Sequence, residues 1–375
     1  MADWLPLSGI RVVDFSMFVP GPFASAILAD LGAEVIKVEP TKGDPGRAYV
    51  PVQFDTENRN KRSIALDLKI PASRTVVEKL VGNAQVVLEG FRPGVAKRLS
   101  IDYETLKRHN PKLVYCSISG YGQTGPWRER PGHDVNYVAA AGGLAFTGQW
   151  LKTPVRSSLP VADMGGGTFA AIAILSSLLE MERTGKGACL DLSLFEAAFF
   201  WAAMRHGLDP AADPRAHIFP VNDVFETADG KRLTLGILEE HFWNSFVGLV
   251  PELDRPEFAD DAARRRNGDA LSAKLAEVMK TRPAADWIRI LEENDVPVDL
   301  CVTPGEAARN AQLEARGALE RGYAKFPVWA NGARGARIRA GTPKLGEHSR
   351  EILVELGFAD SDIAELVRSK AIVIA

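Results

Sequence analysis

The chain has 375 residues, of which 46% are hydrophobic and 25% are charged, and its formal net charge at pH 7 is −3. This length predicts two domains with sizeable cores, and the composition excludes a disordered or fibrous chain. The near balance of acidic and basic residues also argues against a protein that binds nucleic acid through a large basic surface.

Three cysteines lie far apart in the sequence, without the spacing of a zinc site or a disulfide framework. We therefore expect a reduced, cytoplasmic protein. The N-terminus lacks a basic segment followed by an apolar one, so we expect no signal peptide. The apolar stretch 169–179 is interpreted as too short to span a bilayer, and no membrane partner is expected.

Alternating strands and helices are predicted over the first two hundred residues. Short β-branched runs at 10–15 and 35–38 enclose a helical pattern at 23–31, which predicts a right-handed parallel βαβ unit. The same pattern recurs along the chain and predicts strands at 63–68, 84–88, 113–119 and 190–194, and helices at 73–81 and 163–183. The fold class expected is therefore α/β with an open parallel sheet.

The character of the sequence changes after about residue 205. Residues 206–221 are rich in Pro, Asp and Ala and predict a linker, and two short runs around 228–230 predict a hairpin. Two polar helices are predicted between 241 and 293, with the arginines 264–266 on a solvated face. One amphipathic helix is predicted from Ser349.

Residues 120–125 match the pattern GxGxxG after a predicted strand, which is typical of a dinucleotide site. Pro126 follows directly, and a Pro-Gly pair comes at 131–132, so no long helix can begin there to meet a pyrophosphate. We interpret the match as a coincidence, which leaves an NAD-dependent enzyme as a weak alternative.

Asp163 stands just before a run of three glycines, 165–167, at the start of the longest predicted helix. It could be the N-cap of that helix, or a base or nucleophile beside free backbone N–H groups that suit an anion. His133 lies in a predicted loop, and it too has two possible roles, as a hydrogen-bonding residue or as a catalytic one. The six histidines show no metal-binding spacing, so metal catalysis is not supported.

Several basic residues follow or flank predicted strands. Singly they are surface charges, but together they could hold a phosphorylated ligand at the carboxyl ends of a parallel sheet. These residues are Lys37, Arg47, Lys61, Arg62, Lys69, Arg92 and Arg98.

Six stretches taken together resemble the family III CoA-transferase superfamily (CaiB/BaiF type), which also contains α-methylacyl-CoA racemase. The resemblance runs nearly from end to end and is specific as a set, and it accounts for the misleading glycine pattern. The stretches are 7–14, 28–39, 60–69, 90–95, 120–126 and 345–348.

This resemblance implies a Rossmann-like large domain at 1–205 that is completed by 335–375, a linker at 206–221 and a small α+β domain at 222–334. It also implies an interlocked homodimer, in which each ring-shaped chain threads the other. The ligand would be an acyl-CoA thioester, with no metal, no redox cofactor and no nucleic-acid or membrane partner. The contacts expected for CoA are Val19, Arg47, Lys69, Arg92 and Arg98.

The resemblance also implies roles for particular residues. Asp163 matches an aspartate that attacks the thioester in transferases and is one of two bases in racemases. His133 lies in a motif similar to that around the second racemase base, and Glu239 matches the glutamate that orients this histidine. Inversion of the α-carbon requires a base on each face and donors for the enolate oxygen, which we assign to the amides at the start of the helix that contains residues 165–167. We therefore expect racemisation of 2-methyl-branched acyl-CoA thioesters.

Other features are similar to transferases and keep a second hypothesis open. Racemases tend to have an arginine where this chain has Pro40, the segment 43–47 is transferase-like, and 217–225 lacks the tyrosines that a racemase suggests. The alternative is transfer of CoA from an acyl-CoA to a carboxylic acid through a mixed anhydride on Asp163. A non-catalytic CoA-binding subunit is a third hypothesis.

Overall fold

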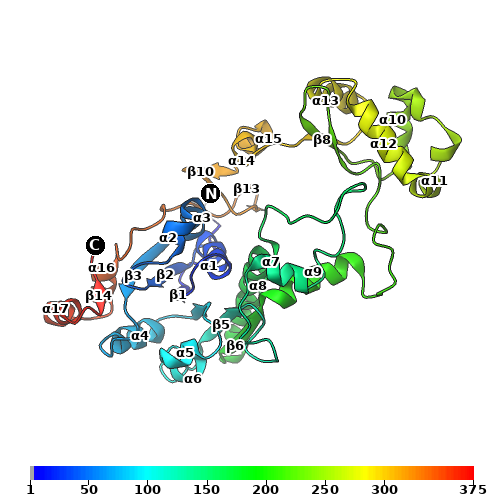
Figure 1. Ribbon diagram of the computed structural model, residues 1–375. Helices are drawn as coiled ribbons and strands as arrows, with labels where there is room; N and C mark the ends of the chain where they lie inside the picture. Colours follow the sequence, from blue (N-terminus) through cyan, green and yellow to red (C-terminus); the bar gives the residue numbers. More distant parts are fainter. Residues whose placement is uncertain (1–3) are drawn as a thin grey trace. The chain divides into compact units, whose positions relative to one another are not determined.

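Residues 4–375 are described by a computed structural model, in which the chain forms two units (Figure 1). The first unit comprises Met1–Ala141, Ser157–Phe200 and Ala311–Ala375, and the second comprises Gly142–Arg156 and Trp201–Asn310. The beginning and the end of the chain therefore belong to the same unit.

These units differ from the predicted domains at both junctions. Residues 142–156 belong to the second unit, as does the predicted linker 206–221, whereas residues 311–334 belong to the first unit. A contact shows how this last segment is attached, because Tyr323 Oη donates to Asp55 Oδ1 at 3.1 Å. Such long-range contacts leave no local signal in the sequence from which this boundary could be predicted.

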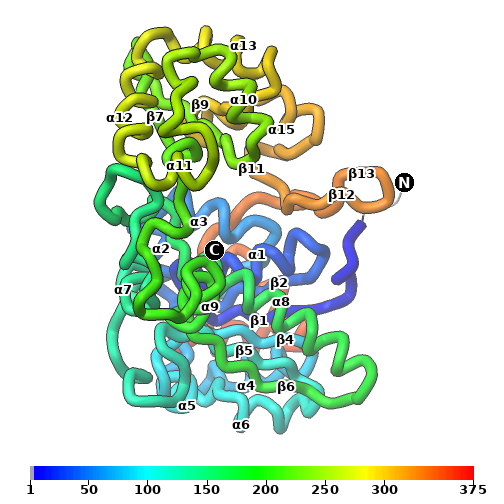
Figure 2. The backbone as a smooth tube through the Cα atoms, turned by 90° about the vertical axis from the view of Figure 1, so that its right-hand side faces the viewer, coloured from blue at the N-terminus to red at the C-terminus, as the bar shows by residue number. Residues whose placement is uncertain are grey.

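A seven-stranded sheet forms the centre of the first unit, in the order β14-β3-β2-β1-β4-β5-β6. Its strands are β1 (Arg11–Asp14), β2 (Glu34–Glu39), β3 (Lys61–Leu66), β4 (Val86–Glu89), β5 (Val114–Ser119), β6 (Ala188–Ser193) and β14 (Ile372–Val373). Neighbours pair in parallel, except that β14 is antiparallel to β3 at the edge. Figure 2 shows β1, β4, β5 and β6 in succession. This strand order is typical of a doubly wound sheet.

The prediction of an α/β fold with a parallel sheet is therefore confirmed. All six predicted strands are present, with ends that lie within two residues of the expected ones. Strand β14 was not expected, because a two-residue strand shows no alternation and its pairing with Leu66 depends on tertiary contacts.

Helices cover both faces of this sheet, so its strands are apolar on both sides. Val12 and Val35 pack with α1 and α8 on one face, whereas Val13 and Ile36 pack with α4, α16 and α17 on the other. The helices of this unit are α1 (Pro20–Asp30), α2 (Gly46–Tyr49), α3 (Pro51–Asn58), α4 (Ser73–Gly82), α5 (Val95–Arg98), α6 (Tyr103–Leu106), α7 (Asp134–Ala140), α8 (Val161–Thr184), α15 (Ala311–Ala315), α16 (Ser349–Glu355) and α17 (Asp360–Arg368). Two helices thus follow Ser349 where one was predicted.

Helix α8 is the longest element of the chain and contains the apolar stretch that was expected to be too short for a membrane. The helix has 24 residues, and by length and composition alone it could cross a bilayer. Half of its most apolar window is buried within the protein, where Ala170 and Ile174 belong to the core. The central helix of a folded domain meets the same criteria of length and hydropathy, so these criteria do not assign a membrane.

The second unit is built on a three-stranded antiparallel sheet, β7-β8-β9. Its strands are β7 (Val224–Glu226), β8 (Arg232–Leu235) and β9 (Val298–Leu300), and its main helices are α10 (Glu240–Leu249), α11 (Asp261–Arg266), α12 (Gly268–Met279), α13 (Ala284–Glu293) and α14 (Pro304–Ala307). The predicted hairpin is confirmed, and four helices replace the two expected between 241 and 293. Helix α9 (Leu194–His206) begins in the first unit and ends in the second.

Arg264 contradicts the prediction that the triple arginine is a solvated face. Its side chain is buried, lies 4.8 Å from the Trp243 ring centroid and donates to Phe258 O and to Glu240. A guanidinium can stack on an aromatic face while its edge makes hydrogen bonds, so a charge run does not by itself indicate exposure.

Candidate functional site

A cavity of about 720 Å³ opens in the first unit at the carboxyl ends of β1, β4, β5 and β6. Its wall includes Val19 after β1, Arg92 after β4 and Gly120 after β5, together with His133 and Asp163. Open parallel sheets bind ligands at this edge because the loops after the strands converge there. The fold thus brings together the two predicted bases and two of the predicted CoA contacts.

Asp163 is the third residue of α8, which begins at Val161 after Pro160. It is therefore not the N-cap, and its carboxylate lies in the first turn, where the helix dipole favours a negative charge. The side chain lines the cavity and is half-buried. This placement fits a reactive carboxylate better than a capping residue.

Asp134 holds the beginning of α8 from outside that helix. Its buried Oδ1 accepts hydrogen bonds from Ala162 N at 2.7 Å and from Asp163 N at 3.3 Å. These are N–H groups of the first turn, which have no partner within a helix. Asp134 is not predicted from the sequence, although it is adjacent to His133, because its partners lie 28 and 29 residues further along the chain.

The glycine run after Asp163 lies inside α8 and not at the N-terminus of the helix. Residues 165–167 lie beyond the first turn of α8, where helix N–H groups bond to carbonyls of the preceding turn. A Cβ on Gly167 would lie 2.7 Å from Pro20 O, and a Cβ on Gly166 would lie 2.3 Å from Leu194 Cδ2. The glycines therefore allow close packing of α8. The helix-start amides of Ala162 and Asp163, predicted as donors for an enolate oxygen, already donate to Asp134 Oδ1.

We expect Asp134→Ala to destabilise the protein by about 2 kcal/mol, because two buried N–H groups lose their acceptor. Turnover should fall as well, since the backbone that carries Asp163 loses its anchor. Urea unfolding and steady-state kinetics would measure both effects. Asp134→Asn is the matched control, because it keeps an oxygen acceptor and should recover most of the stability. Equal stability of the alanine variant and the parent protein would contradict this role.

His133 directly precedes α7 and lines the cavity with an exposed side chain. Its backbone N–H donates to Asn136 Oδ1 at 3.0 Å. Tyr137 Oη donates to Gly132 O at 2.6 Å, and a Cβ on Gly132 would lie 2.6 Å from the same ring. The loop before α7 is thus held on both sides of His133. Burial, together with the nearby charge of Asp163, raises the pKa of Tyr137 to about 12, so this hydroxyl remains a neutral donor.

Seven basic residues were predicted as possible contacts for a phosphorylated ligand, and four of them form salt bridges inside the protein. They pair with carboxylates as Lys37–Asp44, Lys61–Asp14, Arg47–Glu39 and Arg62–Glu34. Arg47, an expected CoA contact, is bound by both oxygens of Glu39 at 2.8 Å and donates to Pro343 O. The structure therefore places this guanidinium against an internal carboxylate and not on the wall of the 720 Å³ cavity.

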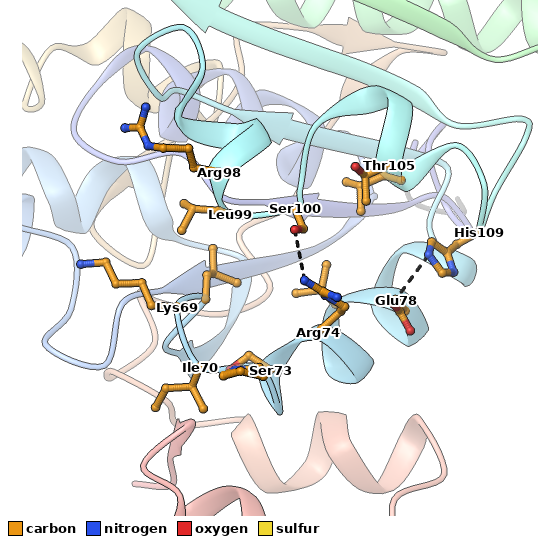
Figure 3. Close-up of a pocket in the computed structure, with 14 residues that line it drawn as sticks. Lys69, Ile70, Ser73, Arg74, Glu78, Arg98, Leu99, Ser100, Thr105 and His109 are labelled. Carbon is orange, nitrogen blue, oxygen red and sulfur yellow. Dashed lines mark hydrogen bonds and ion pairs between the residues drawn. The ribbon is translucent and has the colours of Figure 1, made fainter.

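Lys69 and Arg98 line a second cavity of about 260 Å³ in the first unit, beside α4, α5 and α6. Figure 3 shows both side chains on the same side of this pocket, and within residues 4–375 neither has a carboxylate at salt-bridge distance. Arg74 donates to Ser100 Oγ at 3.4 Å in the same pocket. Three cations against a single carboxylate, Glu78, make this pocket suitable for an anionic group.

Glu239 lies in the second unit, immediately before α10 and in extended conformation. It thus belongs to a different unit from His133 and Asp163. Its neighbour Glu240, the competing match in the sequence, is bound by the buried Arg264. In the part of the chain that the structure describes, no three His, Cys, Asp or Glu side chains are arranged to hold a metal ion.

Glu57 on α3 is a buried carboxyl group that is near enough to Asp163 to be affected by its charge. Its Oε1 accepts from Gln53 Nε2 at 2.8 Å, and burial raises its pKa from 4.5 to about 8. The pKa of Glu57 is higher in the folded protein than in the unfolded chain. Its contribution to the free energy of unfolding is therefore complete below about pH 4.5 and is lost as the pH rises towards 8.

We expect the neutral variant Glu57→Gln to be more stable than the parent by about 3 kcal/mol at pH 7, with little difference near pH 4. Urea unfolding of both proteins across this pH range would measure the effect. The exposed Glu182→Gln is the control and should show no such trend. A difference that stays constant with pH would show that Glu57 is ionised in the folded protein.

The fold and the cavity define a class, an α/β protein with a ligand site at the carboxyl edge of a doubly wound sheet. A family model described as CoA-transferase family III matches residues 7–349, and the chain belongs to this family.

The relatives carry two kinds of name. The chain is 35% identical to an acetyl-CoA:oxalate CoA-transferase of Acetobacter aceti, over 93% of this chain and 95% of that protein. It is 32% identical to the α-methylacyl-CoA racemase of Homo sapiens, over 98% of both chains. The crystal structure of a CAIB/BAIF family protein from Brucella suis superposes with a TM-score of 0.83 at 31% identity, covering 94% of this chain and 99% of that one. The names are thus divided between transferases and a racemase.

Proposed function

We propose that the protein racemises 2-methyl-branched acyl-CoA thioesters by removing and returning the α-proton. The observation that carries this proposal is that His133 and Asp163 line one cavity from two different elements, α8 and the loop before α7. Inversion beside a carbonyl needs one base on each face of the α-carbon, with one deprotonated while the other is protonated. A carboxylate and an imidazole can exchange these states near neutral pH.

In the proposed reaction one base takes the α-proton and the electron pair moves into the thioester, which forms an enolate. The protonated second base then delivers a proton to the opposite face, so the product differs only in configuration. Asp134 holds the backbone at Asp163, and Tyr137 holds the loop that carries His133. Glu239 would orient the imidazole, as the resemblance implies. The proposed steps use side chains alone and involve no metal or redox cofactor.

We place the nucleotide of CoA against Lys69 and Arg98, and the thioester in the larger cavity with Arg92 and Val19. Lys69 follows β3 and Arg98 follows β4, so both lie after strands whose carboxyl ends face the same edge of the sheet. Unpaired cations in a pocket suit phosphate oxygens.

We expect Arg98→Ala to weaken binding of acetyl-CoA about tenfold, because one charge-assisted contact to phosphate is lost. Binding of acetyl-pantetheine, which has no nucleotide, should stay unchanged. Calorimetric titration would measure both, with the exposed Lys112→Ala as control. Equal loss for both ligands would place the nucleotide elsewhere.

The proposal is tested by incubating the protein with one enantiomer of a 2-methylacyl-CoA in deuterated water without an acceptor acid. Uptake of deuterium at the α-carbon together with loss of optical purity is the expected result. Absence of exchange with several acyl chains would contradict racemisation. Tight binding of these esters without any turnover would instead favour the non-catalytic subunit.

CoA transfer is the second candidate, and a specific feature of the cavity favours it. Arg92, Arg128 and Arg130 line the cavity, and an acceptor acid needs cationic partners for its carboxylate, whereas a branched hydrocarbon does not. In this reaction Asp163 would attack the thioester carbonyl, form a mixed anhydride and release CoA as the thiolate. Hydroxylamine would convert that anhydride to a hydroxamate on Asp163, which mass spectrometry detects.

We also propose the interlocked homodimer that the resemblance implies. Large apolar side chains on α8 and α9 are exposed in the first unit, at Ile172, Leu179, Phe199 and Phe200. Exposed apolar area of this kind is typical of a surface that another chain covers. Light scattering after gel filtration should give twice the mass of the chain, and a monomer at micromolar concentration would contradict the proposal.

A further inference from the structure

The loop between β1 and α1 forms part of the cavity wall and contains a strained residue. Phe18 and Val19 line the cavity, and Phe18 has a φ of 62°. Residues other than glycine avoid this left-handed region because Cβ meets the backbone, so the surrounding structure must hold such a residue in place.

A buried ion pair lies directly behind this loop. Lys37 Nζ is 2.9 Å from Asp44 Oδ2, and both side chains are fully buried. Lys37 Nζ also donates to Ser16 O at 3.0 Å, and Asp44 Oδ1 accepts from Phe18 N at 3.4 Å. The two ions thus bond to the loop backbone on either side of Met17.

The same carboxylate also organises the segment after β2. Asp44 Oδ1 accepts from Gly46 N at 2.8 Å, and Asp44 N donates to Glu39 Oε2 at 3.1 Å. Gly21 adds a steric constraint, because a Cβ there would lie 2.2 Å from Ser16 Cβ. The loop is therefore clamped between the ion pair and the first turn of α1.

A buried ion pair gains little stability over apolar side chains of the same size, because both charges lose their water. Here the hydrogen bonds of the pair go to backbone that forms the cavity wall. We infer that Lys37 and Asp44 are positioning residues that hold the segment 17–19 in the conformation that receives the acyl-CoA thioester. The inference rests on the proposed function for the identity of the ligand.

The test compares two double variants that both remove the buried charges. Lys37→Met/Asp44→Ala removes the acceptor for Phe18 N, whereas Lys37→Met/Asp44→Asn keeps an oxygen there. The first should bind acetyl-CoA about tenfold more weakly, because only a fraction of molecules keeps the receptive loop. The second should recover part of this affinity, because it keeps the acceptor for Phe18 N but still lacks the hydrogen bond from Lys37 Nζ to Ser16 O. In turnover assays the KM of the first variant should rise more than its kcat falls.

A matched control separates this effect from a general loss of stability. Arg59 and Asp30 form another ion pair at the end of α1, in which Asp30 is buried and Arg59 is half-buried, and neither residue lines the cavity. Arg59→Met/Asp30→Asn should change the unfolding midpoint without changing the affinity for acetyl-CoA. Parental affinity in a folded Lys37→Met/Asp44→Ala protein would overturn the inference, as would an equal loss in the control.

Failure of the proposed function gives a different result. If the parent protein binds no CoA thioester, the proposed function is wrong. The conformation of the loop is then compared between crystal structures of the parent and of Lys37→Met/Asp44→Ala. A displaced segment 17–19 and a negative φ at Phe18 in the variant are expected. An unchanged loop would overturn the inference whatever the ligand.

Discussion

Asp163→Asn is expected to lower kcat about a thousandfold, with little change in the affinity for CoA thioesters. Both candidate reactions need this carboxylate, as a base in racemisation and as the nucleophile in transfer. Asparagine has nearly the same shape but neither accepts the α-proton nor forms an anhydride. Chromatography of the CoA esters would measure turnover, and calorimetry would measure binding.

Glu182→Gln is the matched control for this variant, because it removes a carboxylate from the exposed far end of the same helix. It should leave kcat unchanged. Turnover of Asp163→Asn within about tenfold of the parent would exclude both candidate reactions at this residue.

His133→Ala has the second large expected effect, and it distinguishes the two reactions. If His133 is one of two opposed bases, racemisation should fall at least about a hundredfold. Asp163 would still exchange the α-proton of the enantiomer that presents this proton to it. The measurement is deuterium uptake and optical purity for each enantiomer separately.

For a transferase, His133 is only a neighbour of the acyl group, and His133→Ala should then keep near-normal transfer to an acceptor acid. This result would remove the racemase hypothesis. The exposed His241→Ala, in the second unit, controls for loss of an imidazole elsewhere and should leave either reaction unchanged.

The sequence was informative where a local pattern determines the structure. Strands buried on both faces appear as short apolar runs, so the six parallel strands were recognised within two residues of their ends. Asp163 and His133 were recognised through motifs, and the structure places both on one cavity. The GxGxxG match was rejected on its prolines, and no helix begins within 120–125 in the structure.

The beginning of α8 shows what a local pattern does not contain. The residues around Asp163 suggested an N-cap followed by free glycine amides, yet the helix begins at Val161. It can do so because the carboxylate of Asp134 satisfies its first-turn N–H groups from another helix. The glycines instead meet Pro20 and Leu194, which are distant in the sequence.

The sequence by itself determined the α/β fold, the family resemblance and the two candidate bases, because these depend on local runs and motifs. It did not determine which basic side chains are available to a ligand. Only the tertiary structure showed that Lys37 and Arg47 are bound by carboxylates. It also showed that Lys69 and Arg98 line a pocket in which neither side chain forms a salt bridge with any carboxylate of residues 4–375. The physical reason is that a charge becomes available to a ligand only if no internal partner reaches it, and such partners come from other strands and loops.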